Sequence, residues 1–152
     1  EISRAVGAQG MVGGQMLDLV GEQSVFGKPE ITRLQRMKTG ALINCSCQAG
    51  AILGDASETQ RHLLNAYAHD IGLAFQIVDD LLDIDGDPDK LGKATNKDIK
   101  AGKATFVSLL GVERARAQAE ILINQAIKNI ESFGEKSDLL RDLARFVIER
   151  HN

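Results

Sequence analysis

The stretch IGLAFQIVDDLLDIDGDPD, residues 71–89, decides how the rest of the chain is interpreted. It begins with a helical run that is apolar on every side, and such a run is expected to lie inside the protein. Six aspartates then fall within eleven residues: Asp79, Asp80, Asp83, Asp85, Asp87 and Asp89. A carboxylate at the C-terminal end of a helix destabilises it by about 0.3–1 kcal/mol, because the helix dipole favours a cation at that end. Asp79 and Asp83 also repel each other at a spacing of four residues, so the pattern predicts a bound cation.

Two other interpretations of the aspartates fit the sequence less well. Acidic runs are most often solvated surface, but Asp79 directly follows the apolar run that ends at Val78, and unpaired acids beside a core are unfavourable. An EF-hand loop that starts at Asp83 would need glycine at its sixth position and glutamate at its twelfth. The chain has Pro88 and Ala94 at those positions, which excludes an EF-hand. Among hard cations, Mg2+ binds through one or two carboxylates and keeps waters or substrate phosphates as its other ligands.

The remainder of the chain predicts an all-α fold. Strand signals are nearly absent, since the sequence shows no period-two alternation and few aromatic residues. A stripe of residues at spacings of three and four, from Ile31 to Cys45, indicates a helix that starts at Pro29. Asp55 and Glu58 resemble a capping box for a long helix that ends near Asp83. The other predicted helices cover residues 3–19, 104–133 and 137–150, with a loop over residues 84–102. Together they predict part of a helical bundle.

Glycines are unusually frequent in the first predicted helix. Gly7, Gly10, Gly13 and Gly14 all fall within residues 3–19. Each glycine inside a helix costs about 1 kcal/mol relative to alanine. This cost implies that another backbone or a ligand approaches the helix closely.

Basic residues follow the aspartates at once. Lys90, Lys93, Lys97, Lys100 and Lys103 lie in the predicted loop, where any single lysine is most simply a solvated side chain. Carboxylates and ammonium groups in one place, however, suit a metal-bound phosphate ester. Lys38 lies on the apolar stripe of its helix, so its ammonium group either reaches out to solvent or faces a buried anion. Gln76, three residues before Asp79, either meets a ligand or satisfies a core polar group.

Composition narrows the class of protein. The 152 residues carry a net charge of −3, which becomes +3 without the six clustered aspartates, so the acidity is local and no basic face for nucleic acid is present. Cys45 and Cys47 fit neither a disulfide framework nor a zinc site, and we expect reduced thiols in a cytoplasmic protein. No apolar run reaches the length of a membrane span. The chain begins at Glu1 in the middle of a helical pattern, which we interpret as a piece of a longer protein.

Several short motifs of the chain resemble those of a known family. FQIVDDLLD (residues 75–83), LGK (91–93) and GKAT (102–105) resemble the second aspartate-rich motif and the following loop of the isoprenyl (polyprenyl) diphosphate synthases. GGQMLD (13–18) and KTGAL (38–42) match the same family in the same order, most closely its bacterial short-chain farnesyl diphosphate synthase type. The resemblance implies that residues 1–152 are the C-terminal portion of a single polyprenyl synthetase domain. Its fold would be an all-α barrel of long helices around a central cavity.

The resemblance also implies roles for individual residues. Asp79, Asp80 and Asp83 would hold Mg2+ on the diphosphate of an allylic substrate. Lys38 and Lys93 would bind diphosphate oxygens, with Lys103 as a further basic contact. Thr39 and Gln76 would line the place where the allylic cation forms, which makes Lys38, Thr39 and Gln76 the expected catalytic residues. Gln15 and Asp18 would flank this site.

The implied activity is a head-to-tail condensation of dimethylallyl or geranyl diphosphate with isopentenyl diphosphate, with farnesyl diphosphate as the expected product. The alternatives are a geranylgeranyl diphosphate synthase, a non-catalytic partner subunit of a heteromeric synthase, a terpene cyclase and a structural bundle. The first aspartate-rich motif of the family does not occur in this chain, so we expect residues 1–152 alone to be inactive. The full-length protein is expected to be a cytoplasmic homodimer. Product length is not readable from these residues.

Overall fold

A computed structural model describes residues 1–21, 23–24, 26–85 and 105–150. Within these residues every regular element is helical and none is a strand, as the sequence predicts. In chain order they are α1 (Ile2–Val6), α2 (Met11–Gly21), α3 (Lys28–Gln35), η1 (Arg36–Gly40), α4 (Ala41–Leu53), α5 (Glu58–Asp85), α7 (Phe106–Leu110), α8 (Val112–Asn129), η2 (Glu131–Ser137) and α9 (Asp138–Glu149). Over the described residues, no helix has both the length and the apolar character of a bilayer span.

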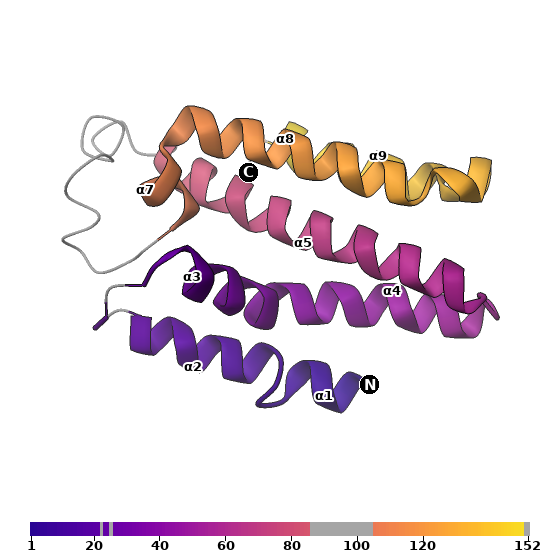
Figure 1. Cartoon of the computed structure of the whole chain (residues 1–152), viewed down its shortest axis with the longest axis horizontal. Coiled ribbons are helices and arrows are strands. Elements are labelled where there is room, and N and C mark those ends of the chain that lie inside the picture. The colour runs from indigo at the N-terminus through magenta and orange to yellow at the C-terminus, as the bar shows by residue number, and fades with distance from the viewer. Residues whose placement is uncertain (22, 25, 86–104, 151–152) are drawn as a thin grey trace.

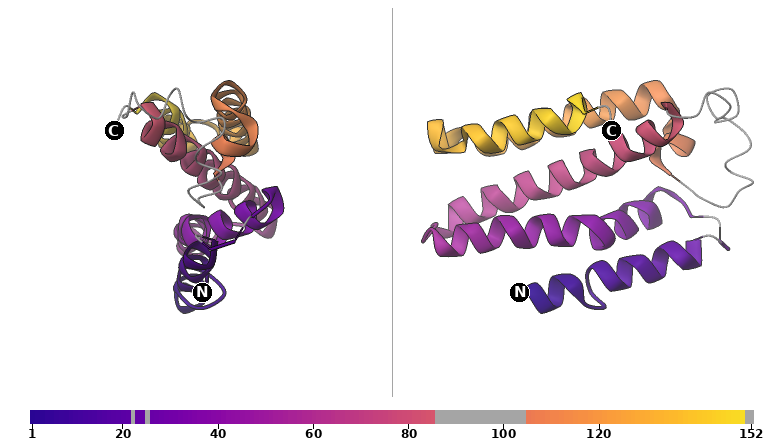
Figure 2. Two further views of the ribbon diagram at one scale, coloured as in Figure 1. Left: turned by 90° about the vertical axis from the view of Figure 1, so that its left-hand side faces the viewer. Right: turned by 180° about the vertical axis from the view of Figure 1, so that it is seen from behind.

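The long helix α5 lies at the centre of the arrangement. Figure 1 shows α1 and α2 in one row, α3 and α4 in the next, and then α5, with α8 and α9 beyond it. The view from the end shows the same order, with α1–α4 on one side of α5 and α8 and α9 on the other (Figure 2). The most extensive helix pair is α5 with α8, and the next is α5 with α4. The position of α5 therefore depends on both neighbours.

The core forms where α5 meets α8. From α5, a stripe of residues at spacings of three and four is buried, and it faces small and aliphatic side chains of α8. The buried hydrophobic residues of these two helices are Tyr67, Ala68, Ile71, Ala74, Ile77, Val78, Leu81, Ile84, Ala115, Ala119, Leu122, Ile123 and Ala126. Burying an aliphatic side chain of this size stabilises a fold by about 1.5–3 kcal/mol. Tyr67 also donates its hydroxyl to Leu140 O at 2.8 Å, which ties α9 to α5.

The first predicted helix is wrong as a continuous element. Residues 3–19 form two helices, because α1 ends at Val6 and α2 begins at Met11. Gly7 has an extended backbone, with φ −72° and ψ −162°, which ends α1. The expected close approach is confirmed at Gly14, where an added Cβ would lie 2.2 Å from the backbone nitrogen of Lys38. The glycine therefore lets α2 approach η1 at backbone distance.

Two further boundaries differ from the prediction. The predicted helix over residues 104–133 is divided at Gly111, whose φ of +81° no helix accommodates, and α8 ends at Asn129. The capping box of α5 is made by Ser57 and Gln60, not by Asp55 and Glu58. Ser57 N donates to Gln60 Oε1 at 2.8 Å, and Gln60 N donates to Ser57 Oγ at 3.3 Å. This reciprocal pair satisfies two of the free N–H groups at the helix start.

Cys45 and Cys47 are free and partly buried, in agreement with the prediction of reduced thiols. Burial raises the pKa of the Cys47 thiol above its usual value. A thiol that resists ionisation is a poor nucleophile and metal ligand. Cys47 is therefore best explained as a partly buried side chain of α4.

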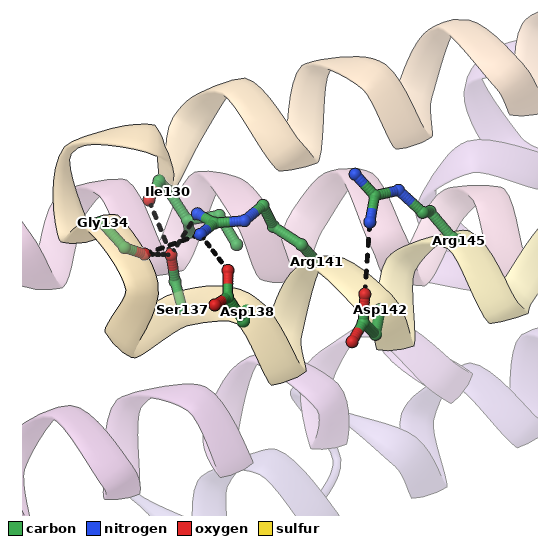
Figure 3. A network of polar contacts seen from close by, with 7 residues as sticks. All are labelled: Ile130, Gly134, Ser137, Asp138, Arg141, Asp142 and Arg145. Carbon is green, nitrogen blue, oxygen red and sulfur yellow. Dashed lines mark hydrogen bonds and ion pairs between the residues drawn. The ribbon is translucent and has the colours of Figure 1, made fainter.

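A polar network sets the direction of α9 (Figure 3). Ser137 is almost fully buried, and its Oγ lies 3.1 Å from Ile130 O and 2.9 Å from Gly134 O. Arg141 donates to Ser137 Oγ at 2.6 Å and to Gly134 O at 2.7 Å, and it pairs with Asp138. Figure 3 shows these groups converging on the turn before α9. The network holds the chain where it reverses and runs back along α5.

Replacement of Ser137 tests this network. We expect Ser137→Ala to lower the free energy of unfolding by about 1–2 kcal/mol, because a buried carbonyl and Arg141 each lose a partner. Urea denaturation followed by circular dichroism measures this change. Ser46→Ala is the control: Ser46 Oγ bonds Leu42 O at 3.0 Å on an exposed surface. Surface changes of this kind are within about 0.5 kcal/mol. Equal losses in the two variants would contradict the role of Ser137.

A pair of glycine substitutions tests the approach of α2 to η1. Gly14→Ala should destabilise the protein by about 1–3 kcal/mol, because the new methyl group meets backbone atoms that side-chain rotation does not relieve. Gly50→Ala should have the opposite sign. Gly50 lies inside α4 with nothing within 4 Å of an added Cβ, and alanine is the better helix former by about 1 kcal/mol. Thermal unfolding of both variants gives the two signs, and a neutral Gly14→Ala would refute the close contact.

Candidate functional site

A cavity of about 380 Å3 lies at the acidic end of α5. Side chains from α2, α3, η1 and α5 line it, together with Thr105 at the start of α7. The cavity brings together most of the predicted site residues that the structure describes, namely Lys38, Gln76, Asp79, Asp80, Asp83 and the flanking Asp18. Gln15 is exposed on α2 and does not line it. Lys93 and Lys103 lie outside the described residues.

Lys38 is held by a turn of π-helix. The predicted helix from Pro29 passes through η1, a single π turn between α3 and α4, and this turn carries Lys38 and Thr39. Single π turns within helices are frequent at functional sites. Lys38 Nζ donates to Asp18 Oδ2 at 2.5 Å, and these side chains are 35% and 18% exposed. Of the two options for Lys38, the structure therefore favours a partly buried anion, supplied by α2.

Thr39 and Gln76 join the same π turn to α5. Thr39 Oγ1 donates to Gln76 Oε1 at 2.5 Å. Because Thr39 is the donor, this bond leaves both lone pairs of the threonine oxygen and both amide hydrogens of Gln76 for other partners. Gly72, one turn before Gln76, faces Gly40: an added Cβ on Gly72 would lie 3.4 Å from Gly40 Cα, which is an ordinary van der Waals contact. The polar pair thus sits where two backbones are close.

Two of the three aspartates of the predicted metal site, Asp79 and Asp80, contact different parts of the chain. Asp79 pairs with the guanidinium group of Arg150, which directly follows α9. Asp80 Oδ2 accepts from the backbone N–H of Phe106 at 3.3 Å, at the first residue of α7. Asp83 is exposed. In the described part of the chain, no group of three or more histidine, cysteine, aspartate or glutamate residues is arranged to hold a metal ion.

The donor chemistry nevertheless suits one hard cation. Asp79 and Asp83 lie one helical turn apart on α5 and line the same cavity. Mg2+ needs only one or two carboxylates when phosphate oxygens and waters complete its octahedron. The aspartates therefore fit a shared site that a phosphate-bearing ligand would complete, and they do not fit a cage built from protein alone.

Two residues of this region were missed by the sequence reasoning. Gln35 lines the cavity and is 7% exposed, and within the described part of the chain its buried Oε1 has no hydrogen-bond partner. The sequence does contain one indication of it, because Gln35 is a polar residue within the segment that carries the apolar stripe from Ile31 to Cys45. Arg150 is 71 positions from Asp79, and no local pattern connects the two. Only the return of α9 along α5 brings them together.

Comparisons with known proteins agree with this architecture. Residues 4–143 match the family model described as polyprenyl synthetase. The chain is 42% identical over 151 residues to a dimethylallyltranstransferase of Fischerella ambigua, covering 99% of this chain and 44% of that protein. It is 41% identical over 155 residues to the farnesyl diphosphate synthase of Escherichia coli, covering 99% of this chain and 52% of that protein. It is 40% identical over 157 residues to a geranylgeranyl diphosphate synthase of Cyanophora paradoxa, covering 100% of this chain and 51% of that protein.

A solved structure shows the same fold. The crystal structure of an FPP/GFPP synthase from Zymomonas mobilis superimposes with a TM-score of 0.84 at 49% sequence identity, over 96% of this chain and 48% of that one. The chain thus spans about half the length of the relatives that it matches. The matched region contains the motifs from GGQMLD to GKAT. The sequence match and the shared fold together show that the chain belongs to the polyprenyl synthetase family.

Proposed function

We propose that the full-length protein is a Mg2+-dependent prenyltransferase that joins an allylic diphosphate to isopentenyl diphosphate head to tail. The observation that carries this proposal is the single cavity shared by Lys38, Gln76, Asp79 and Asp83, in a chain of this family. Ammonium and carboxylate groups meet there beside a polar pair. Because the chain spans about half of its relatives, the activity belongs to the whole protein and not to residues 1–152 alone.

The charges of the cavity suit a diphosphate leaving group. Lys38 Nζ, held by Asp18 at 2.5 Å, would donate to a diphosphate oxygen, and such a charge-assisted bond is stronger than a neutral one. Asp79, Asp80 and Asp83 would hold Mg2+, which would supply charge that stabilises the departing diphosphate. Lys93 and Lys103 remain predictions as further diphosphate contacts. Asp18 would keep Lys38 aimed at the cavity in the absence of substrate.

Thr39 and Gln76 suit the other product of ionisation, the allylic cation. Thr39 does not line the cavity itself, but its Oγ1 donates at 2.5 Å to Oε1 of Gln76, which does, so the lone pairs of both oxygens place partial negative charge next to the cavity. Fixed dipoles of this kind stabilise a charge that develops in the transition state without reorganising when it appears. Thr39 and Gln76 would therefore lower the barrier to ionisation of the allylic C–O bond.

A second cavity suits the hydrocarbon part of the substrate. It has a volume of about 700 Å3 and is lined mainly by apolar side chains from α4, α5, η2 and α9. It begins at Ile43, about one turn after Thr39 on the same helical path, and it includes Leu64, Tyr67 and Ile71 of α5. The two cavities share no lining residue, so the second would hold the hydrocarbon chain, whereas exclusion of water beside Gln76 in the first would protect the cation until isopentenyl diphosphate attacks. Loss of a proton would then complete the condensation.

The product and the assembly are narrower proposals. We favour farnesyl diphosphate because the motifs resemble the bacterial short-chain type, although named relatives include both farnesyl and geranylgeranyl diphosphate synthases at similar identity. A cytoplasmic homodimer remains the expected state of the full-length protein. The alternative of a silent partner subunit is disfavoured, because such a subunit has no need for a cluster of mutually repelling carboxylates.

Replacement of Asp79 tests the metal role. We expect Asp79→Asn in the full-length protein to lower turnover of allylic and isopentenyl diphosphates by about 10²–10³, the usual effect of losing one group that stabilises developing charge. Asp142→Asn is the matched control, because Asp142 is 70% exposed on α9 and should leave turnover unchanged. Unchanged turnover in Asp79→Asn would remove Asp79 from the site.

Product analysis tests chain length separately. With dimethylallyl and isopentenyl diphosphates as starting units, chromatography of the dephosphorylated products should show a C15 alcohol as the main species. A C20 main product would replace farnesyl by geranylgeranyl diphosphate without affecting the proposed reaction type. Absence of any prenyl product from folded, full-length protein with Mg2+ would overturn the prenyltransferase proposal itself.

A further inference from the structure

Arg150 is anchored more firmly than a surface ion pair requires. Its guanidinium carbon lies 4.0 Å from the centre of the Phe75 ring, and its Nη2 donates to Phe75 O at 3.2 Å. The same Nη2 donates to Asp79 Oδ1. The Arg150 side chain is 12% exposed, whereas that of Asp79 is 38% exposed. The arginine is therefore held in place by Phe75 and offers its charge to the carboxylate one turn further along α5.

The contacts of Asp79 divide its carboxylate into two halves. Oδ1 accepts from Arg150, and among the described residues Oδ2 has no hydrogen-bond partner, while the residue lines the cavity that contains Lys38. A carboxylate with one oxygen fixed by a hydrogen bond has its rotation restricted. The other oxygen is then presented in one direction, which is how outer hydrogen bonds orient metal ligands.

Stability alone does not account for Arg150. Its Nε is buried and has no hydrogen-bond partner among the residues that the structure describes, and a buried donor without an acceptor is unfavourable. Arginine is nevertheless suited to this position, because its planar group stacks on an aromatic ring and donates at its edge at the same time. A lysine would keep the charge but lose the fixed geometry. The arrangement favours orientation over packing.

We propose that Arg150 is a positioning residue, which fixes the Asp79 carboxylate through Oδ1 so that Oδ2 is presented to a divalent cation held together with a diphosphate. This inference rests on the proposed function, because it takes Asp79 as a metal ligand. It extends the site to the end of α9, which lies beside α5 in the fold (Figure 1). Arg150 would act through Asp79 and touch neither substrate nor metal.

Binding of Mn2+ tests the proposal without any turnover. The probe is Mn2+ with inorganic pyrophosphate, added to full-length protein, and free Mn2+ is measured by its electron paramagnetic resonance signal. Arg150→Gln should weaken Mn2+ binding about 10-fold, the lower end of the effect of losing an outer hydrogen bond to a metal ligand. Arg145→Gln is the matched control on α9, because Arg145 forms only an exposed pair with Asp142 at 3.2 Å (Figure 3). It should leave Mn2+ affinity unchanged.

Combined variants separate positioning from a general loss of structure. In an Asp79→Asn background, Arg150→Gln should have no further effect on Mn2+ binding, because the carboxylate it orients is gone. The same 10-fold loss in both backgrounds, or no loss in the wild-type background, would overturn the proposal. If Asp79→Asn itself leaves Mn2+ binding unchanged, the metal role of Asp79 fails instead, and the two failures are distinguishable.

A second variant covers the case in which Arg150→Gln does not fold. Phe75→Leu removes the ring under the guanidinium group but keeps both charges and an apolar side chain on α5. It should weaken Mn2+ binding by a smaller factor, about 3-fold, since the arginine is then less firmly held. Unchanged affinity in a folded Phe75→Leu protein would contradict the role of the stack.

Discussion

The packing of α5 between α4 and α8 is the interaction on which the rest of the structure depends. The buried stripe of α5 meets alanines and aliphatic residues of α8, so the two helices lie close over most of their length. On its other side, Gly72 of α5 lies near Gly40, and this contact fixes η1 against the same helix. The acidic end of α5 is thereby held at a defined place. The pairs Thr39–Gln76 and Arg150–Asp79 each include a residue of this helix.

Three polar pairs then join α5 and η1 to distant parts of the chain. Lys38 binds Asp18 of α2, Thr39 binds Gln76 across the helix contact, and Asp79 binds Arg150 after α9. Each pair is partly buried, where charges and dipoles interact more strongly than in water. A site built in this way is organised by helix packing before any ligand arrives. The pairs also link the site to α2 and α9, which otherwise touch different neighbours.

The repulsion among the aspartates is relieved in part by the protein itself. The spacing of the aspartates predicts a cation near Asp79, and Arg150 supplies a positive charge there. Asp80 gains a backbone N–H at the start of α7, where a helix N-terminus favours a negative charge. The described residues therefore do not form a closed metal cage. The Mg2+ that we propose would have to complete its shell with phosphate oxygens and waters.

Patterns within short stretches of sequence were enough to predict the helices and the family of this protein. The spacing of apolar residues predicted the helical fold and the long central helix, and the ordered motifs predicted the family. The predicted helix ends were wrong at Gly7 and at Gly111, where the backbone dihedral angles of a glycine end the helix. The position of a glycine in an apolar pattern does not show which dihedral angles it adopts. The predicted capping residues of α5 were also wrong, because two possible capping boxes, Asp55 with Glu58 and Ser57 with Gln60, overlap in the sequence.

Only the tertiary structure decided which side chains meet. Asp18 and Arg150 lie 20 and 71 positions from their partners Lys38 and Asp79, and such contacts follow from how helices pack, not from any spacing along the chain. The same holds for the buried Oε1 of Gln35, which becomes exceptional only when its surroundings are known. Sequence alone thus determined the residue types that carry charge and the helices that bear them. Packing decided which charges face one another, because distance in space governs electrostatic interaction.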